Sequence, residues 1–134
     1  MPEPELLFVY GLLRRGMSAG LDAFVPGMAT YRGPASVAGQ LYSVGGRYPA
    51  LVVSEHPGSQ LVRGELWTIT DPFAWPIIDD FEGIGPDYAA PQLYLRVAVN
   101  ADTDDGKTVR AQAYAYNRSV ADLDPVDSGD WANR

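Results

Sequence analysis

The chain has 134 residues, of which 46% are hydrophobic and 20% charged, and this is typical of a soluble globular protein with one hydrophobic core. Its formal net charge of -7 and its single lysine, Lys107, argue against sequence-independent nucleic-acid binding and against a polybasic membrane patch. No segment approaches the roughly 18 consecutive apolar residues of a membrane span. The lack of cysteine excludes disulfides, thiolate zinc sites and a cysteine nucleophile.

Nothing in the sequence divides the chain. It contains no internal repeat, low-complexity tract or linker-like shift in composition, so we expect a single domain over residues 1–134 with its core at about 6–131. Met1 to Glu5 are acidic and lack the basic region that opens a signal peptide, which favours a cytoplasmic protein. The oligomeric state has no signature in the sequence.

An apolar run near the N-terminus ends in a tight turn. Leu6 to Tyr10 is followed by Gly11, and this pattern predicts a buried strand and not an amphipathic helix. Gly11 can adopt a positive φ and admits the close approach of another chain or a ligand. The N–H groups of such a turn form a nest that suits a carboxylate or a phosphate. On residue types alone, a core strand with an ordinary turn is the plainer interpretation.

The next part of the chain indicates short strands. Residues 16–33 are interrupted by proline and glycine and predict a short helix or a loop. Strands are expected at 36–42, at 50–53 and at Gln60 to Ile69. Gly64, inside the third of these strands, indicates a bulge or a close approach to the backbone.

A helix is expected after the third strand. Asp71 is a suitable N-cap and Pro72 a suitable first residue, while Pro76 marks an irregular position. The apolar residues that we expect this helix to turn inward are Phe73, Ile77, Ile78 and Phe81.

Two further strands are expected to form a hairpin. Leu93 to Val99 alternates between apolar and polar positions, and Thr108 to Tyr116 returns as its partner after an acidic connection at 100–107 that contains the favoured turn pair Asp105-Gly106. Many short strands with few helices indicate an α+β fold built on a small mixed, mainly antiparallel β-barrel with short helices.

Glu82 is the main candidate for catalysis. It follows Phe81 and precedes Gly83, so we expect it where a helix ends close to the core. Apolar surroundings disfavour the charged form of a carboxyl group and raise its pKa toward a value useful for proton transfer. Asp79 and Asp80 would act in the same direction if they lie nearby. Taken alone, these residues are also typical of a solvated acidic helix end.

Seven short motifs follow one another along nearly the whole chain. They are Phe8-Val9-Tyr10-Gly11, Gly39-Gln40-Leu41-Tyr42 with Tyr48-Pro49-Ala50, Val62-Arg63-Gly64-Glu65-Leu66-Trp67, Asp79-Asp80-Phe81-Glu82-Gly83, Tyr94-Leu95-Arg96, Ala113-Tyr114-Ala115-Tyr116 and Gly129-Asp130-Trp131. Each motif is weak by itself. In this order they resemble the γ-glutamylcyclotransferase-like family, which includes AIG2-like and γ-glutamylamine cyclotransferase-like proteins, from roughly Leu6 to Trp131.

The resemblance implies the γ-glutamylcyclotransferase-like barrel and an enzyme of the transferase or lyase type. Such an enzyme converts a γ-glutamyl amine or a γ-glutamyl peptide to 5-oxoproline and the free amine. The matching position makes Glu82 the catalytic residue, acting as general acid and base. The turn residues Tyr10, Gly11, Leu12 and Leu13 would bind the small-molecule substrate, together with Tyr114. The resemblance implies no metal and no cofactor.

One position departs from the family pattern. A small hydroxylated residue usually follows the glycine of the turn, whereas this chain has Leu12. A binding role of the backbone survives that change, but a role of the hydroxyl is lost. Leu12 therefore supports an alternative, a non-catalytic small-molecule-binding domain on the same fold. A protein-interaction module is a third hypothesis, which no motif favours.

Some polar residues have two interpretations. Tyr94, Arg96 and Tyr116 either line a pocket beside Tyr114 or form the polar outer face of the hairpin. Arg14 is the nearest fixed positive charge to the turn, although an exposed loop arginine is the plainer interpretation.

Two apparent metal sites are set aside. His56 lies in a turn without a matching cluster of ligands and is interpreted as a surface residue. The acidic stretch 100–106 is not a calcium loop, because its glycine comes one place late and the twelfth position is Ala111 instead of glutamate.

Overall fold

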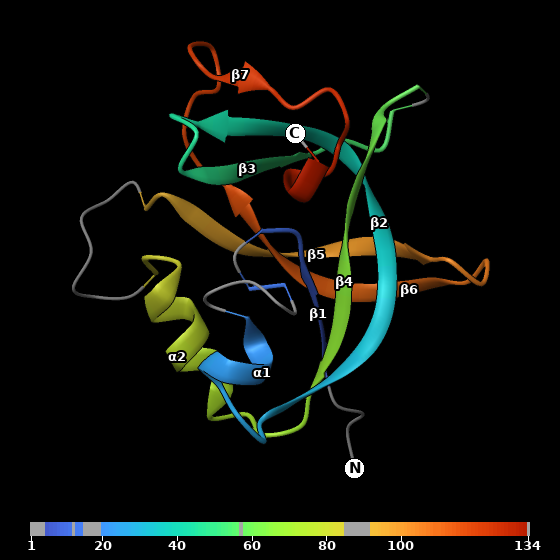
Figure 1. Ribbon diagram of the computed structural model, residues 1–134, viewed down its shortest axis with the longest axis vertical. Helices are drawn as coiled ribbons and strands as arrows, with labels where there is room; N and C mark the ends of the chain where they lie inside the picture. The colour runs from blue at the N-terminus through green and yellow to red at the C-terminus, as the bar shows by residue number, and fades with distance from the viewer. Residues whose placement is uncertain (1–4, 12, 15–19, 57, 85–91, 134) are drawn as a thin grey trace.

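The computed structural model describes residues 5–11, 13–14, 20–56, 58–84 and 92–133 (Figure 1). Its strands are β1 (Leu6–Val9), β2 (Ala29–Val44), β3 (Tyr48–Val53), β4 (Gln60–Ile69), β5 (Tyr94–Thr103), β6 (Thr108–Tyr116) and β7 (Asp124–Pro125). Its helices are α1 (Leu21–Phe24), α2 (Ala74–Phe81) and the 3-10 turn η1 (Trp131–Asn133). None of the described helices is both long and apolar enough to cross a membrane.

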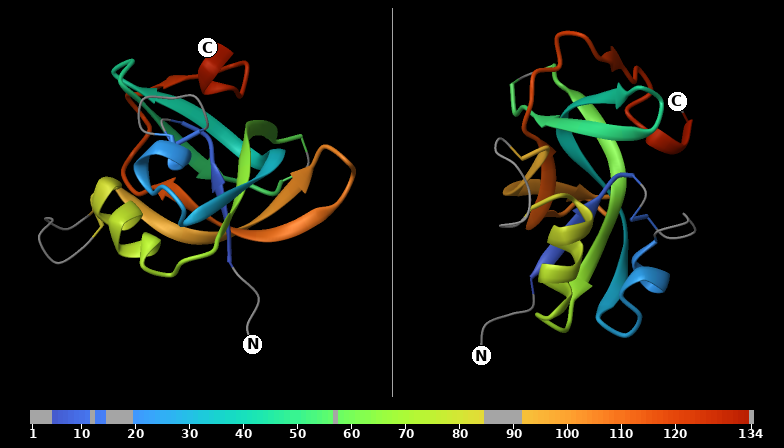
Figure 2. Two further views of the ribbon diagram at one scale, coloured as in Figure 1. Left: turned by 60° about the horizontal axis from the view of Figure 1, so that its bottom comes forward. Right: turned by 90° about the vertical axis from the view of Figure 1, so that its left-hand side faces the viewer.

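Five strands close into a barrel, which confirms the expected fold class. Their order is β2-β4-β1-β6-β5, and β5 returns to β2 through the pairs Ala35–Thr103, Ser36–Asp102 and Val37–Ala101. The β1–β6 pair is parallel and the other pairs are antiparallel. β3 and β7 pair with the far half of β2 and lie beyond the barrel with η1 (Figures 1 and 2).

β4 has the bounds that its sequence predicts, and Gly64 has the expected role. A Cβ added at Gly64 would lie 2.6 Å from Cζ of Phe8 and would also collide with the carbonyl oxygen of Val9. β1 can therefore cross β4 at this point only because the position carries no side chain.

β2 is longer than the sequence suggests. The stretch expected to be a short helix or loop contains α1, but from Ala29 onward it is already strand, and residues 29–39 pair with β4. The register shifts between Tyr31 and Gly33, where Gly33 has a φ of 131°. Gly33 thus lies in a bulge of β2, and the regular pairing with β4 resumes after it.

β1 and the second half of β4 bury both of their faces, in two separate layers. Phe8 and Leu66 point into the barrel interior, whereas Leu7 and Trp67, one residue away on the same strands, point outward into a second layer that also contains Ile78 of α2. α1 and α2 cover this second layer on one side of the barrel (Figure 1). The rings of Phe24 and Phe81 join the two helices, with centroids 5.0 Å apart.

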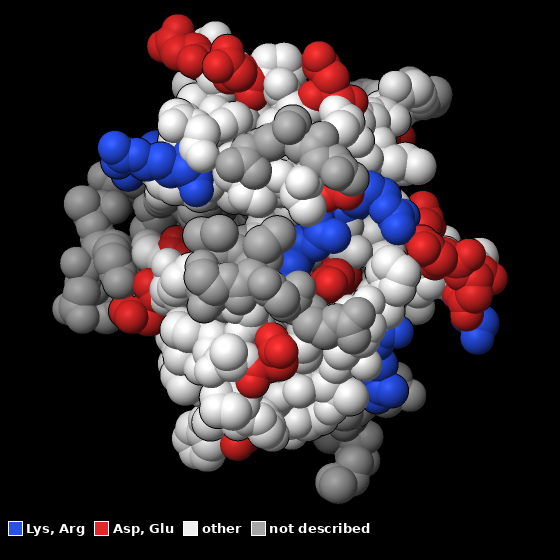
Figure 3. All heavy atoms as spheres, in the orientation of Figure 1, with Lys and Arg blue, Asp and Glu red and all other residues white. Residues whose placement is uncertain are grey.

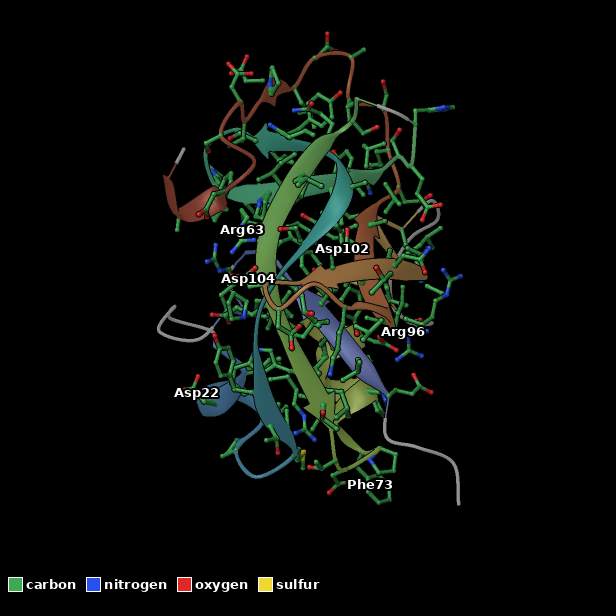
Figure 4. All side chains as sticks on the ribbon, turned by 90° about the vertical axis from the view of Figure 1, so that its right-hand side faces the viewer. Asp22, Arg63, Phe73, Arg96, Asp102 and Asp104 are labelled. Carbon is green, nitrogen blue, oxygen red and sulfur yellow. The ribbon has the colours of Figure 1, made fainter. Side chains whose placement is uncertain are left out.

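The inward face of α2 agrees with the expectation at Ile78 and differs from it at the other three residues. Ala74 and Ile78 are fully buried, whereas Phe73 is 75% exposed and Ile77 and Phe81 are each 40% exposed. Phe73 lies at the outer end of the molecule in Figure 4. The helix also begins two residues later than Pro72, and its N-cap is Phe73 without a side-chain cap hydrogen bond, so the expected N-cap role of Asp71 was wrong. Asp71 instead stabilises the turn before the helix, because its Oδ1 accepts a hydrogen bond of 3.0 Å from the N–H of Phe73.

The β5–β6 hairpin forms as expected, but its connection is shorter. β5 continues to Thr103, so the acidic connection shrinks to residues 104–107, closed by a 2.8 Å hydrogen bond from the N–H of Thr103 to the carbonyl of Lys107. Gly106 adopts a φ of 89° there. Arg63 of β4 reaches the hairpin and lies 3.1 Å from a carboxylate oxygen of Asp104 (Figure 4).

Charged side chains of both signs are interspersed on the surface. On the face drawn in Figure 3, the Lys and Arg side chains lie in separate small groups among acidic ones.

Candidate active site

Glu82 lies at the C-terminal end of α2. Its N–H donates to the carbonyl oxygens of Ile78 and Asp79, at 3.0 and 3.1 Å, and Gly83 then reverses the chain with a φ of 76°. The last turn of a helix is an unfavourable position for a carboxylate, because the unpaired carbonyl groups there carry partial negative charge. The acidic side chain at this helix end lies against the barrel, in the wall of the cavity described next.

A cavity of about 280 Å³ opens where this helix end meets the barrel. Its volume is just below the range of roughly 300–1,000 Å³ that is usual for small-molecule sites. The residues that line it come from β1 and the turn after it, β3, the end of α2, β5 and β6. They are Phe8, Val9, Tyr10, Gly11, Leu13, Tyr48, Pro49, Phe81, Glu82, Gly83, Leu93, Tyr94 and Tyr114.

Most of the site residues expected from the sequence therefore meet in one place. Glu82, Tyr10, Gly11, Leu13 and Tyr114 all line this cavity. The remaining candidate, Leu12, lies outside the described residues.

The turn after β1 is packed tightly against β3. The pairing of β1 with β4 ends at Val9, and the N–H of Arg14 donates to the carbonyl of Gly11 at 3.1 Å to close the turn. A Cβ at Gly11 would lie 2.5 Å from Cγ of Pro49. Of the two roles that the sequence allows for Gly11, the structure has the close approach and not the positive φ, so it is the proximity of Pro49 that requires glycine here.

Three tyrosine hydroxyls in the cavity wall donate to acceptors of the protein. Tyr10 donates to the carbonyl of Tyr114, Tyr94 to the carbonyl of Pro49 at 2.6 Å, and Tyr114 to Oδ1 of Asp79 at 2.6 Å. Burial is the main cause that raises the pKa of each of the three phenols above its ordinary value. The tyrosines therefore stay neutral and act as a rigid frame around the cavity.

The Glu82 carboxyl lies in the cavity wall together with these tyrosines. Burial raises its pKa from 4.5 to about 7, and the negative charge of nearby Asp79 adds to the effect. Asp80, the second carboxylate considered from the sequence, is exposed and does not contribute to this shift. A carboxyl with a pKa near 7 can both accept and return a proton at neutral pH.

The hairpin tyrosines resolve the two interpretations left open by the sequence. Tyr94 and Tyr114 are buried and line the cavity, whereas Tyr116 packs edge-on against Tyr94 with ring centroids 5.7 Å apart. α2 thus packs over the hairpin face at Tyr94 and Tyr114, whereas Arg96 on the same face is exposed. Arg96 lies outside the cavity wall, and its Nη1 is 3.6 Å from Oδ1 of Asp79.

Arg14 does not extend into the cavity. Its Nη1 lies 2.7 Å from Oδ1 of Asp130, and the two side chains are only 18% and 19% exposed. The arginine therefore ties the turn after β1 to the C-terminal segment, instead of being an exposed loop residue.

Sequence reasoning missed part of the apolar wall. Tyr48 and Pro49 line the cavity, and their presence in one of the seven motifs was the available signal. Phe81 was expected to be buried, and Leu93 was assigned only to a strand face. In the part of the chain that the structure describes, no group of three or more His, Asp or Glu side chains is arranged to hold a metal ion.

The chain belongs to the γ-glutamyl cyclotransferase, AIG2-like family, whose model matches residues 7–133. Protein ytfP from Escherichia coli has a similar solution structure, with 31% sequence identity, a TM-score of 0.65, and coverage of 96% of this chain and 97% of that one. A search of curated proteins finds no sequence match.

Two more distant solved structures share the fold. An AIG2-like protein from Mus musculus is 23% identical, with a TM-score of 0.69 and coverage of 95% of this chain and 88% of that one. A protein described as a γ-glutamyl cyclotransferase is 17% identical, with a TM-score of 0.64 and coverage of 92% of this chain and 70% of that one.

Proposed function

We propose that the protein converts a γ-glutamyl amine or γ-glutamyl peptide to 5-oxoproline and the free amine, with Glu82 as general acid and base. The observation that carries this proposal is the position of Glu82 in a cavity whose wall includes the turn at Tyr10 and Gly11. Membership of the family supports the reaction class.

The chemistry needs a group that moves protons between two nitrogens. The α-nitrogen of the γ-glutamyl group attacks the γ-carbonyl carbon, a five-membered ring closes, and the bond from that carbon to the leaving nitrogen breaks. The attacking nitrogen starts as an ammonium group and ends as a lactam N–H, so it loses two protons. The leaving nitrogen gains two and departs as an ammonium ion.

Glu82 is suited to this transfer. In each of two successive transfers its carboxylate takes a proton from the attacking nitrogen and its carboxylic acid returns that proton to the leaving nitrogen, which is efficient because its pKa of about 7 lies near neutral pH. Positioned acid–base catalysis of this type contributes roughly 10²–10⁴-fold. Confinement of the flexible γ-glutamyl chain in the cavity adds a proximity term.

The substrate-binding roles follow from the cavity wall. In this proposal the backbone at Tyr10, Gly11 and Leu13 holds the α-carboxylate of the substrate or the oxyanion that develops on the carbonyl. The sequence assigns the same role to Leu12, which lies outside the described residues. Tyr114 lines the cavity, and its hydroxyl holds the end of α2 in place through the hydrogen bond to Asp79.

The test is release of 5-oxoproline from a panel of γ-glutamyl amines and γ-glutamyl dipeptides, for the wild type and for Glu82→Gln. Glutamine keeps the shape of the side chain and removes its proton transfer. We expect release by the wild type and a loss of about 10²–10⁴-fold in the variant. A folded wild type that is inactive on the whole panel but binds γ-glutamyl compounds would contradict the proposal and favour the non-catalytic binding domain.

A further inference from the structure

Four side chains fasten α2 to the β5–β6 hairpin next to the cavity. Trp75 and Asp79 are four residues apart, so they lie on the same face of α2. Arg96 and Tyr114 are directly opposite each other in the register of the hairpin. The two pairs meet: the Arg96 guanidinium lies over the Trp75 ring, 4.4 Å from its centroid, and Asp79 Oδ1 contacts both Arg96 Nη1 at 3.6 Å and the Tyr114 hydroxyl at 2.6 Å.

This junction lies one helical turn before Glu82. The N–H of Glu82 donates to the carbonyl of Asp79 at 3.1 Å, so a displacement of Asp79 moves the backbone that carries the Glu82 side chain. The Asp79 carboxylate accepts a hydrogen bond from the Tyr114 hydroxyl and pairs with Arg96. These two contacts hold Asp79 against the hairpin. Figure 4 shows Arg96 at the surface on the β5–β6 side of the molecule, and Arg96 is not among the residues that line the cavity.

We propose that Arg96 is a positioning residue of the site, which holds Asp79, and with it the helix end that carries Glu82, against the hairpin and balances the negative charge of Asp79. This inference rests on the proposed role of Glu82. Arg96 acts through Asp79 and touches no reacting atom.

The charges around Glu82 agree with this role. The ionisable groups that face it come from the helix and from three strands or strand ends; they are Asp79 of α2, Tyr10 after β1, Tyr94 of β5 and Tyr114 of β6. The tyrosines are neutral, so Asp79 supplies the negative charge that opposes ionisation of Glu82. Arg96 has the opposite sign, and its positive charge reaches the site, since it lowers the pKa of Tyr114 against the larger effects that raise it.

A purely structural salt bridge is the competing explanation. The Arg96 and Asp79 side chains are 33% and 21% exposed, and ion pairs with such exposure contribute little to folding stability. Substitution of Arg96 is therefore expected to leave the protein folded. Any effect on Glu82 can then be measured in a native structure.

The experiment is an NMR titration of the Glu82 side-chain carboxyl carbon in the wild type, Arg96→Met, Arg96→Lys and Asp79→Asn. Methionine keeps an apolar stem over Trp75 and removes the charge, whereas lysine keeps the charge. We expect Arg96→Met to raise the midpoint by about 0.5–1 pH unit and Asp79→Asn to lower it by a similar amount, less than the roughly 1–3 units of a charge in direct contact. Arg96→Lys should restore at least half of the difference.

The matched control is Arg110→Met on β6, because Arg110 is exposed and hydrogen-bonds to Asn100 away from the site. It should leave the midpoint unchanged. An unchanged midpoint in a folded Arg96→Met variant would overturn the proposal, as would an equal shift in the control.

The titration does not depend on turnover, so it separates this inference from the proposed function. In parallel, 5-oxoproline release is measured against pH. If the wild type releases 5-oxoproline, the pH at which Arg96→Met reaches half of its maximal kcat/KM should rise with the NMR midpoint. A fall in rate without any shift in that pH would show a merely structural role and would overturn the proposal. Absence of release by every variant would overturn the proposed function, and the NMR midpoints would still decide whether Arg96 acts on Glu82.

Discussion

Removal of the Glu82 charge should stabilise the protein at high pH. The variant is Glu82→Gln, which replaces the carboxyl by an uncharged group of nearly the same shape. In the wild type, the Glu82 carboxyl has a pKa of about 7 in the folded state, against 4.5 for an ordinary glutamate. Between these two pH values the folded protein holds a proton that the unfolded chain has released.

The sign and size of the effect follow from this difference. Because the folded pKa is raised, the contribution of Glu82 to stability is most favourable below about pH 4.5 and is lost as the pH rises to about 7. Each pH unit corresponds to about 1.4 kcal/mol, so the complete loss is about 3 kcal/mol. Part of it has already occurred at pH 5, which leaves about 2–3 kcal/mol between pH 5 and pH 8.

The assay is urea unfolding followed by tryptophan fluorescence, at pH 5 and at pH 8, for the wild type and Glu82→Gln. The free energy of unfolding of the variant minus that of the wild type should be larger at pH 8 than at pH 5 by about 2–3 kcal/mol, because the variant gains stability relative to the wild type at high pH. Glu55→Gln, at an exposed glutamate, is the control. An equal difference at both pH values would show that the Glu82 carboxyl is not desolvated in the folded protein, and the reasoning would fail.

Three other substitutions test the packing and the cavity. Gly64→Ala adds a methyl group where β1 crosses β4 and should lower the free energy of unfolding by about 1–3 kcal/mol, as measured by urea unfolding. Tyr94→Phe leaves the Pro49 carbonyl without its donor and should cost about 1–3 kcal/mol in the same assay. Phe81 is half-exposed at the cavity. In a series of γ-glutamyl alkylamides, each added methylene should raise kcat/KM of the wild type about two- to fourfold, and Phe81→Ala should reduce this gain. Phe73→Ala, on the same helix but outside the cavity wall, should leave that gain unchanged.

Local patterns were sufficient for some parts of the fold. β4 keeps its predicted bounds, because an apolar-rich run between turn residues has few alternatives to a strand. The turn after β1 and the helix end at Glu82 were also located correctly, since glycine marks both. The closed barrel agrees with the expected class.

Other parts depend on tertiary contacts that a local pattern does not contain. Phe73, Ile77 and Phe81 form one apolar stripe on α2, and Ala74 and Ile78 form the neighbouring one. Helical periodicity cannot decide which of two adjacent apolar stripes faces the core. In the structure Ala74 and Ile78 are in the buried layer, while Phe81 packs against Phe24 and lines the cavity.

The junction beside Glu82 is the clearest case of this limit. Asp79, Arg96 and Tyr114 come from three different elements, and the sequence gives no sign that one carboxylate contacts both of the others. The polarity of Arg96 and Tyr114 on the hairpin was equally consistent with a solvent-exposed face. Only the packing of α2 over that face distinguishes the two cases.

The most direct test of the proposed role of Glu82 is the pH dependence of kcat/KM for 5-oxoproline release by the wild type, with Glu82→Gln measured beside it. Because the carboxylate form must accept the first proton, the rate of the wild type should rise with pH through a midpoint of about 7, and Glu82→Gln should have lost this rise together with most of the activity. A wild-type midpoint near 4.5, the ordinary value for glutamate, would contradict the account. Full activity in Glu82→Gln would contradict it as well, because the proton would then be carried by another group.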